Sequence, residues 1–424
     1  MNIMILTTSL CGGGAERVSA RLASELSRNH NVWIVCTYPD GNWKGTYDLD
    51  PRVKQIDLDP PPPFKGKITA RWLLYPVRAR QRKLMIRDLK TEIRADVCIS
   101  FLAEPNFDNV RSAQGEKTII SVRNIYKLPI RKFWFWQLMD RFLMVTAGRR
   151  ADRVVTVSNN VGVEQIKRYH VQKRKIRTIY NPVDPDAIRR ASEAPTGHDA
   201  FDAFRAAHDV LFLSAGRFVE QKGFHHLIRA FREVSQQCPG AGLVLMGEGH
   251  LQDSLERVIR ANGLENHVLL PGFHKDPFPF FGKCDVFVMS SFYEGFSNAM
   301  LEAMACGLPV ILTDCNSGPR EMCAPDTDST LQTQTVDYAL WGILTPVCSG
   351  HMALTDEPPE PEEKCLADAM CRLASDSSLR EDYARRSLTR ANDFSTDRIM
   401  EQWESLLLEL CGPQQADRPS GGAC

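Results

Sequence analysis

The sequence predicts an α/β protein made of two doubly wound domains, each a parallel sheet covered by helices on both faces. Three observations support this prediction. The 424 residues are enough for two or three domains. The composition, 43% hydrophobic and 25% charged, is that of an ordinary globular chain. Short, continuously apolar segments alternate with amphipathic helical segments, and this alternation starts twice, once in each half of the chain.

The first half repeats the order strand, turn and helix. Apolar strands are expected at residues 2–8, 31–37, 95–101, 117–122 and 152–158. The first strand leads through three glycines into a helix that ends near Asn29. Because these strands are apolar throughout, they belong in a sheet that is buried on both faces.

The second half restarts the pattern after a stretch at 180–200 that we interpret as a linker. Strands are expected at 210–217, 242–247, 267–273, 285–291 and 310–313. Helices are expected at 223–237 and 250–263, and a short helix before the fourth of these strands. The acidic segment 356–363 has the composition of a solvated loop.

These elements predict the domain organisation. We assign residues 1–184 to the first domain and 185–393 to the second. Residues 394–411 form a helix expected to pack back on the first domain, and 412–424 a disordered tail. Ligands bind beyond the carboxyl ends of such strands, so two facing domains predict a deep interdomain cleft as the site.

Targeting and redox signals indicate a cytoplasmic protein. The opening MNIMILTT lacks the charged start of a signal peptide, and no run of about eighteen uncharged apolar residues is present. The 13 cysteines are an odd number without a C-x-x-C pair, as in reduced intracellular proteins. We therefore expect a chain without structural zinc.

The zero net charge conceals a marked asymmetry. Residues 1–187 carry 32 basic and 18 acidic side chains, whereas 188–424 carry 20 basic and 34 acidic ones. This asymmetry predicts that the first half meets an anion: a membrane surface, a nucleic acid or a phosphorylated acceptor.

The turns that follow the strands hold the candidate binding residues. After the first strand, Gly13 and Gly14 allow close approach of the backbone to a phosphate. This turn lacks the lysine and hydroxyl of a P-loop, and Arg17 stands where G-x-G-x-x-G requires its last glycine, so the signal is weak.

The segment AGRFVEQKGF at 215–224 carries a sharper signal. After Gly216, the Arg217 guanidinium and the Lys222 ammonium suit a diphosphate, because the guanidinium binds two oxygens while the ammonium acts as a mobile point charge. A solvated surface pair is the alternative. The turn at Gly247 is a further glycine-containing turn after a predicted strand, and Phe273 is placed to lie against a nucleobase.

Two glutamates frame a predicted helix start in SSFYEGFSNAMLEAMACGLPVILTD, residues 290–314. Glu294 precedes the helix, Ser297 or Asn298 is its N-cap, and Glu302 lies one turn beyond Asn298. The free amides from Gly295 through Phe296 to Asn298 offer an anion site between two acids. The alternative is a buried helix whose acids are favoured by its dipole.

Taken together, these motifs resemble the retaining glycosyltransferases of family 4, which have the two-domain GT-B fold. The resemblance rests on GGAERV, SAGRFVEQKGFHHLIRAF and EGFSNAMLEAMACGLPV. It extends over nearly the whole chain through TVSNN, IYNPVD, SGPREM, YALWGILTPV and DFSTDRIMEQWESLL. Glu294 and Glu302 fit the family's E-x7-E motif.

The resemblance implies a nucleotide-sugar donor, with UDP as the expected nucleotide. Arg217 and Lys222 then hold the diphosphate, Glu294 touches the donor sugar and Glu302 accepts hydrogen bonds from the ribose hydroxyls. It also implies transfer of a hexose or N-acetylhexosamine with retention, giving an α-glycosidic bond.

Members of this family often carry a histidine near the active centre in the first domain, whereas the corresponding strand end of this chain reads SVRNIYK. A subset of bacterial polysaccharide enzymes resembles the chain here, so Arg123 and Asn124 are assigned to donor or acceptor contact. Structural capping by Asn124 is an equal alternative. The expected catalytic residues are Glu294, Arg217 and Lys222. The full substrate-binding set is Gly13, Gly14, Arg123, Asn124, Gly216, Arg217, Lys222, Gly247, Phe273, Glu294, Gly295, Phe296, Ser297, Asn298 and Glu302.

No metal or cofactor is expected in catalysis, because cationic side chains and amides meet the charge that grows on the leaving diphosphate. Four D-x-D triplets, at 48–50, 57–59, 184–186 and 326–328, have the flanking residues of turns. Donor transfer is therefore expected to persist in EDTA.

Two basic segments indicate the acceptor. Residues 60–94 carry ten basic and two acidic side chains, and 123–153 carry eight and two, with Trp134 and Trp136. Such segments suit an anionic bilayer, so a glycan or polyprenyl-diphosphate-linked acceptor and a peripheral position on the inner face of the membrane are expected. A solvated basic face is the alternative, and Pro76 argues against one long interfacial helix.

Two other functions remain open. A nucleotide-sugar epimerase or hydrolase of the same fold would consume the donor without an acceptor. A nucleic-acid-binding protein would use the basic half, but no RNP, zinc-finger or helix-turn-helix signature accompanies it, so no nucleic acid is expected.

Overall fold

The computed structural model describes the backbone of residues 1–11, 13–38, 47–58, 68–124, 134–351 and 357–412, and the side chains of all of these except 68–76 and 134–140. The chain divides into two compact units. Unit 1 contains Met1–Val157, Val161–Tyr180 and Asp397–Cys424, and unit 2 contains Ser158–Asn160 and Asn181–Thr396. Residues 413–424 of the expected tail lie outside the described part.

Unit 1 is built on a parallel sheet of seven strands in the order β3-β2-β1-β4-β5-β6-β7. The strands are β1 (Asn2–Thr7), β2 (Asn31–Cys36), β3 (Lys54–Asp57), β4 (Val97–Phe101), β5 (Lys117–Val122), β6 (Arg153–Thr156) and β7 (Ile176–Thr178). The helices are α1 (Gly14–Leu26), α2 (Ile68–Ile93), α3 (Ala103–Arg111), α4 (Trp134–Arg150), α5 (Asn159–Tyr169) and α15 (Thr396–Cys411). Strands buried on both faces account for the continuous apolar runs.

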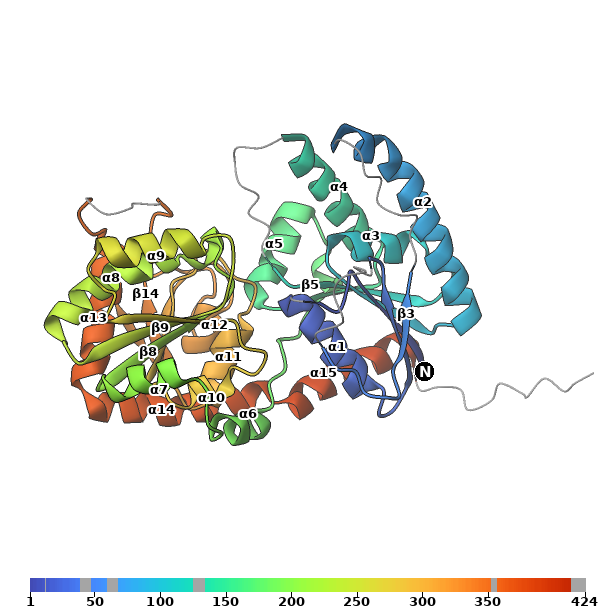
Figure 1. Ribbon diagram of the computed structural model, residues 1–424. Coiled ribbons are helices and arrows are strands. Elements are labelled where there is room, and N and C mark those ends of the chain that lie inside the picture. The colour runs from blue at the N-terminus through green and yellow to red at the C-terminus, as the bar shows by residue number, and fades with distance from the viewer. Residues whose placement is uncertain (12, 39–46, 59–67, 125–133, 352–356, 413–424) are drawn as a thin grey trace, which may run out of the picture. The chain divides into compact units, whose positions relative to one another are not determined.

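Helices cover both faces of the unit 1 sheet (Figure 1). On one face, α1 and α15 pack on strand residues such as Ile3, and Trp403 of α15 is 1% exposed in that core. On the other face, α2 packs Ile86 against Met4. The last helix is therefore part of the core of unit 1.

Unit 2 has a second sheet of seven strands in the order β10-β9-β8-β11-β12-β14-β13, parallel except for β13. The strands are β8 (Val210–Ala215), β9 (Ala241–Met246), β10 (Val268–Gly272), β11 (Val286–Met289), β12 (Val310–Thr313), β13 (Asp337–Ala339) and β14 (Gly342–Thr345). The helices are α6 (Pro185–Ser192), α7 (Asp199–Ala206), α8 (Phe224–Gln237), α9 (Gln252–Ala261), α10 (Phe278–Phe281), α11 (Asn298–Ala305), α12 (Pro319–Cys323), α13 (Pro361–Ser375) and α14 (Ser377–Ala391).

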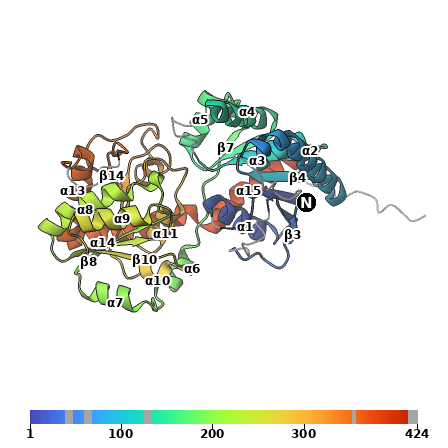
Figure 2. The same ribbon diagram turned by 45° about the horizontal axis from the view of Figure 1, so that its top comes forward.

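In unit 2, α8 and α9 lie on one face of the sheet and α14 on the other (Figures 1 and 2). The strand order reverses its direction between β8 and β11, which are hydrogen-bonded neighbours. In doubly wound sheets this reversal is the point where ligands bind, beyond the carboxyl ends of the strands.

Three local expectations are wrong. The stretch at 180–200 holds α6 and the start of α7, because Asp184 caps α6 by accepting a hydrogen bond from the Ala187 amide at 3.0 Å. Residues 361–363, expected in a loop, begin α13 with a proline at its first turn, where proline is favoured.

The third concerns Pro76, which lies inside the continuous helix α2. A proline costs about 3 kcal/mol in a helix interior. The turns that follow it offset this cost, since Arg82, Ile86 and Lys90 are buried along α2. Among the helices of the described residues, none is both long and apolar enough to cross a bilayer.

Candidate functional site

Two neighbouring turns of unit 2 carry the sharpest sequence signals. The β8 turn (residues 216–223) follows β8, and the β11 turn (residues 290–297) follows β11. Because β8 and β11 are adjacent and parallel, their turns emerge side by side at the switch point of the sheet.

Gly223 allows the two turns to meet. It ends a short 3₁₀ helix, Glu220–Lys222, in the left-handed conformation with φ 59°. A Cβ at this position would lie 2.3 Å from the carbonyl oxygen of Ser290 in the β11 turn. Glycine is therefore required both by its backbone conformation and by the close approach.

Three hydrogen bonds fix the β8 turn to the β11 turn. The Ser290 hydroxyl donates to the Lys222 carbonyl at 2.8 Å. The Phe292 amide donates to the Gln221 carbonyl at 2.9 Å, and the Gln221 side chain donates to the Tyr293 carbonyl at 2.7 Å. The position of Lys222 relative to Glu294 thus follows from the backbones of both turns.

Lys222 and Glu294 form an ion pair at 2.7 Å, joining the Nζ atom to Oε1. Their side chains are 16% and 8% exposed, so the pair is largely withdrawn from water. Lys222 neutralises the charge of Glu294, and its ammonium group has two further N–H donors for a ligand. The structure thus brings together two of the three residues predicted to be catalytic.

The β11 turn leads into α11, whose N-cap is Ser297 as one of the two predicted choices. The Ser297 side chain makes no capping hydrogen bond. The turn itself is held by Asn181, which donates to the Phe296 carbonyl at 2.8 Å, and by the Ser317 hydroxyl, which donates to the Gly295 carbonyl. The amides in the first turn of α11, beginning with Asn298, have no acceptor within the helix itself.

Both predicted acids of this region are buried. Glu294 is 6% and Glu302 8% exposed. Glu302 lies on α11 one turn after the half-buried Asn298. A buried carboxylate requires polar partners. The favourable interaction with the helix dipole does not by itself require the two acids to be buried.

The turns after β8 and β9 are also in contact. A Cβ at Gly247, where φ is 138°, would lie 2.0 Å from the carbonyl oxygen of Gly216, and the Gly216 amide donates to Met246 at 2.9 Å. This close approach explains the glycine at 247, whereas a Cβ at Gly216 would meet the Lys222 side chain at 3.1 Å. The contact of both glycines with a ligand stays a prediction.

Two predicted contacts point into solvent. Arg217 is exposed at the end of β8. Phe273 follows Gly272, which has φ 87°, and is 61% exposed. An exposed aromatic ring at a strand end is available for stacking.

In unit 1 the predicted residues also follow strands. Gly13 is the N-cap of α1, and the Glu16 carboxylate occupies the space that a Cβ of Gly13 would need, 1.9 Å away. Glu16 therefore supplies a negative charge to the helix start beside Gly14, which further weakens the prediction of a phosphate there.

Arg123 and Asn124 follow β5. The Arg123 guanidinium lies 5.1 Å from the centre of the Phe101 ring, and burial lowers its pKa. An arginine keeps its charge nevertheless, so this group favours an anion. The Asn124 Oδ1 atom accepts no hydrogen bond within the described residues, so no cap involving this oxygen is seen there.

The basic face of unit 1 is smaller than the sequence suggests. Arg82 of α2 is paired with Asp108 at 2.7 Å and Lys90 with Glu116 at 2.6 Å, and all four side chains are at most 3% exposed. These charges are neutralised inside the unit and cannot attract an external anion.

Aspartates of the D-x-D triplets that lie in the described part of the chain have partners within the protein itself. Asp50 pairs with Arg52 at 2.8 Å, Asp184 caps α6, and Asp328 accepts from the Thr330 amide at 2.9 Å. One other group, His226, Cys348 and Glu360, places metal-binding atoms close together within the described part of the chain.

Three supporting residues escaped the sequence analysis. Gln221, Ser290 and Ser317 hold the two turns through hydrogen bonds that depend on strand order. Ser317 has a positive φ of 77°, which is rare for serine. The motif SGPREM was the available signal for it.

Each half of the chain matches a glycosyltransferase family model. Residues 12–187 match the family model "Glycosyltransferase Family 4", and residues 199–337 match "Glycosyl transferases group 1". An uncharacterised glycosyltransferase of Methanocaldococcus jannaschii is 30% identical over 355 residues, covering 79% of this chain and 84% of that protein.

A second relative spans more of the chain. It is the N-acetylgalactosamine-N,N'-diacetylbacillosaminyl-diphospho-undecaprenol 4-alpha-N-acetylgalactosaminyltransferase of Campylobacter jejuni. The two are 28% identical over 398 residues, which cover 93% of this chain and 96% of the relative.

Solved structures establish the fold. HepE of Anabaena, in complex with UDP and glucose, has a TM-score of 0.69 at 20% identity and covers 96% of this chain and 99% of its own. WaaG, a glycosyltransferase involved in lipopolysaccharide biosynthesis, has a TM-score of 0.67 at 15% identity, covering 97% and 100%. With two parallel-sheet units and these matches, the chain belongs to the family 4 glycosyltransferases and has the GT-B fold.

Proposed function

We propose that the protein transfers a hexose or N-acetylhexosamine from a UDP-sugar to a lipid-linked or polysaccharide acceptor, with retention and formation of an α-glycosidic bond. The observation that carries this proposal is the Lys222–Glu294 ion pair at the switch point of unit 2. A buried lysine and glutamate joined across two turns suit a donor that has an anionic diphosphate next to a neutral sugar.

The leaving group is stabilised by cations and amides. Breakage of the anomeric bond places negative charge on the diphosphate and positive charge on the sugar ring. Arg217, Lys222 and the amides at the start of α11 meet the first charge, and no divalent ion is needed for this step. Glu294 faces the sugar, and its pairing with Lys222 keeps it from repelling the diphosphate.

The nucleoside is held at the edges of the same site. Glu302 accepts hydrogen bonds from the ribose hydroxyls, and the exposed ring of Phe273 stacks on the base. The bound UDP in HepE supports UDP as the nucleotide. The α-linkage in the name of the Campylobacter relative supports retention from an α-linked donor.

The acceptor is inferred from relatives and from the surface of unit 1. By their names, two Campylobacter jejuni relatives act on undecaprenol-diphosphate-linked glycans. The match to this chain covers 96% of one relative and 99% of the other. Val77 and Phe142, 52% and 59% exposed on basic helices, suit contact with an anionic bilayer. Arg123 is assigned to the anionic part of the donor or acceptor, with the protein peripheral on the cytoplasmic side of the membrane.

A donor panel tests the proposal. UDP-, GDP- and ADP-sugars are supplied with and without a membrane lipid extract, and release of the nucleotide is followed. The expected result is acceptor-dependent consumption of a UDP-sugar and a product whose anomeric proton coupling is that of an α-linkage. Donor consumption without an acceptor would instead identify a hydrolase or epimerase.

Two variants test the site itself. Arg217→Ala and Lys222→Ala should both weaken UDP binding and slow transfer, because each removes a cation from the diphosphate. Unchanged transfer rates and UDP affinity in both variants would exclude this site for the donor.

A further inference from the structure

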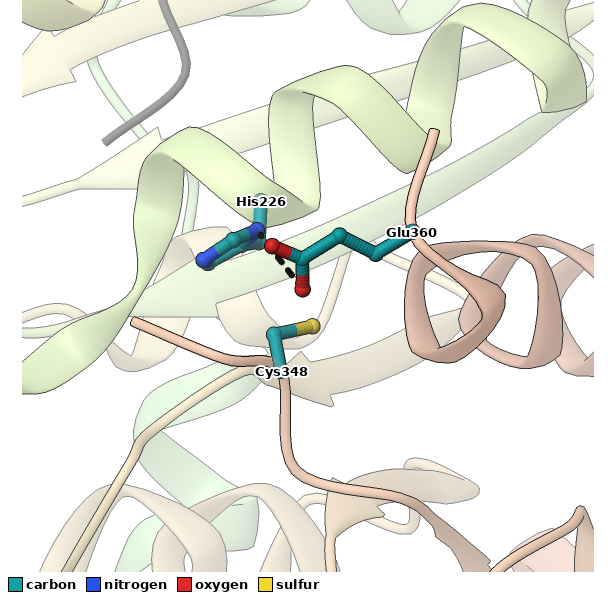
Figure 3. Close-up of side chains that lie close together, drawn as sticks. All are labelled: His226, Cys348 and Glu360. Atoms are coloured by element: carbon teal, nitrogen blue, oxygen red, sulfur yellow. Dashed lines mark ion pairs between the residues drawn. The ribbon is translucent and has the colours of Figure 1, made fainter. Parts of the chain in front are cut away.

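A second polar cluster lies at the start of α8, the helix that follows the β8 turn. His226 is in the first turn of α8, Cys348 follows β14, and Glu360 immediately precedes α13. Figure 3 shows the three side chains converging from these segments. Their ligand atoms, one from each residue, all lie within 4.8 Å of one another.

The cluster is largely buried. His226 is fully buried, Cys348 is 5% exposed, and the Glu360 side chain is 20% exposed. Imidazole, thiolate and carboxylate are the three ligand types that Zn²⁺ takes in proteins. The mixture of nitrogen, sulfur and oxygen donors argues against Mg²⁺ or Ca²⁺, which prefer oxygen ligands.

Hydrogen bonds hold the surrounding carboxylates in place. Glu363 accepts from His226 Nδ1 at 2.7 Å and from Arg229 Nε at 2.8 Å, and from the Glu360 amide at 2.9 Å. Glu360 accepts from the Ser349 amide at 2.9 Å. Metal-binding carboxylates in proteins are oriented by outer donors of this kind.

The charges of the cluster leave room for a cation. Glu360 and Glu363 bring two negative charges, and Arg229 brings one positive charge. A divalent ion bound by the thiolate balances the charge, and the thiol proton leaves to solvent.

We propose that His226, Cys348 and Glu360 form a zinc site, with a water molecule as the fourth ligand. Two ligand atoms about 2 Å from a tetrahedral zinc ion lie about 3.3 Å apart. His226 Nδ1 and Glu360 Oε2 are 4.0 Å apart, so the two side chains approach by a fraction of an ångström when the ion binds. When the ion is bound, the ring proton of His226 lies on Nε2, Nδ1 binds the ion instead of donating to Glu363, and Glu363 keeps its hydrogen bond from Arg229.

The site is structural and lies beside the donor turns. The ring of Phe292, in the β11 turn, is 5.6 Å from the His226 ring and 5.9 Å from the His225 ring. The ion therefore ties α8 and α13 to the segment after β14, at a point that supports the β11 turn. It is not needed for contact with the donor.

Cobalt binding to the full chain tests the proposal. Metal-free protein is titrated with Co²⁺, whose spectrum reports tetrahedral geometry and, through a charge-transfer band, a thiolate ligand. One ion per chain with this band is expected, and Zn²⁺ should displace it because Zn²⁺ binds such sites more tightly. Absence of a stoichiometric ion, or a spectrum without the thiolate band, overturns the site.

Variants identify the ligands. Cys348→Ser should abolish the charge-transfer band and weaken binding at least about tenfold, whereas Cys371→Ser, on the same unit but outside the cluster, should change neither. If Cys348→Ser does not fold, Glu360→Gln provides the test, since its side chain is partly exposed. That variant should bind Co²⁺ at least about tenfold more weakly with the thiolate band intact. Wild-type affinity in both variants, or in Glu360→Gln when Cys348→Ser does not fold, refutes the assignment.

Discussion

Replacing Lys222 by methionine separates the two tasks assigned to its ammonium group. Unit charges 2.7 Å apart attract by about 6 kcal/mol at an effective dielectric constant of about 20. Desolvation cancels part of this attraction, and removal of one partner of a buried pair costs about 3–5 kcal/mol. Since the Lys222 side chain is 16% exposed, we expect Lys222→Met to lower the free energy of unfolding by about 3 kcal/mol.

The same variant should bind UDP more weakly. Loss of one charge-assisted hydrogen bond to the diphosphate costs about 1.5–3 kcal/mol, or about 10- to 150-fold in Kd. Chemical denaturation measures the first effect and isothermal titration with UDP the second. Lys283→Met, at an exposed position of the same unit, is the matched control and should change neither.

The double variant Lys222→Met with Glu294→Gln distinguishes the two effects. It leaves no uncompensated charge, so the free energy of unfolding should recover to within about 1 kcal/mol of the wild type. UDP affinity should stay low, because the diphosphate still lacks its cation. Recovery of UDP affinity would mean that Lys222 only holds Glu294. Full stability of the single variant would contradict the burial of the ion pair in the structure.

Four further outcomes are expected. Gly247→Ala should lower the free energy of unfolding by about 1–3 kcal/mol and weaken UDP binding, because its Cβ would lie 2.0 Å from the Gly216 carbonyl oxygen. In chemical denaturation, Gly263→Ala should lower the free energy of unfolding by less, because its Cβ meets open space. Arg82→Met should destabilise by about 3–5 kcal/mol by leaving Asp108 unpaired in the core, while the exposed Arg80→Met has little effect on the denaturation midpoint. Adding Mg²⁺ or Mn²⁺ to gel-filtered enzyme should change the transfer rate by less than about twofold; a strict requirement would contradict the proposed leaving-group site. Sedimentation with anionic liposomes at low salt should be reduced by Phe142→Glu and not by Leu331→Glu, an equally exposed position in unit 2.

The fold followed from the sequence because continuous apolar strands are a strong local signal. The strand Val310–Thr313 was predicted at the position where the structure has it, and the N-cap Ser297 was one of two predicted choices. Lys222 and Glu294 were each chosen from their place at a strand end. Their contact was not foreseen, because it depends on β8 and β11 being neighbours although the two residues are 72 positions apart.

What the sequence concealed is charge in the interior. Arg82 and Lys90 counted toward a basic surface, but both are buried in ion pairs with partners that are distant in the chain. Glu363 lies in a segment rich in proline and acid, which indicates solvent, yet it is fully buried against His226 and Arg229. Composition reports how many charges are present, whereas their partners are set by tertiary packing.

The last helix has a consequence for biosynthesis. Trp403, Leu406 and Leu407 complete a core that begins with Ile3, so unit 1 remains open during translation until α15 has left the ribosome. The unit in between contains its own hydrophobic cluster and can form earlier. Nascent chains stalled after residue 396 should therefore carry a folded second unit and a first unit that is still accessible to chaperones.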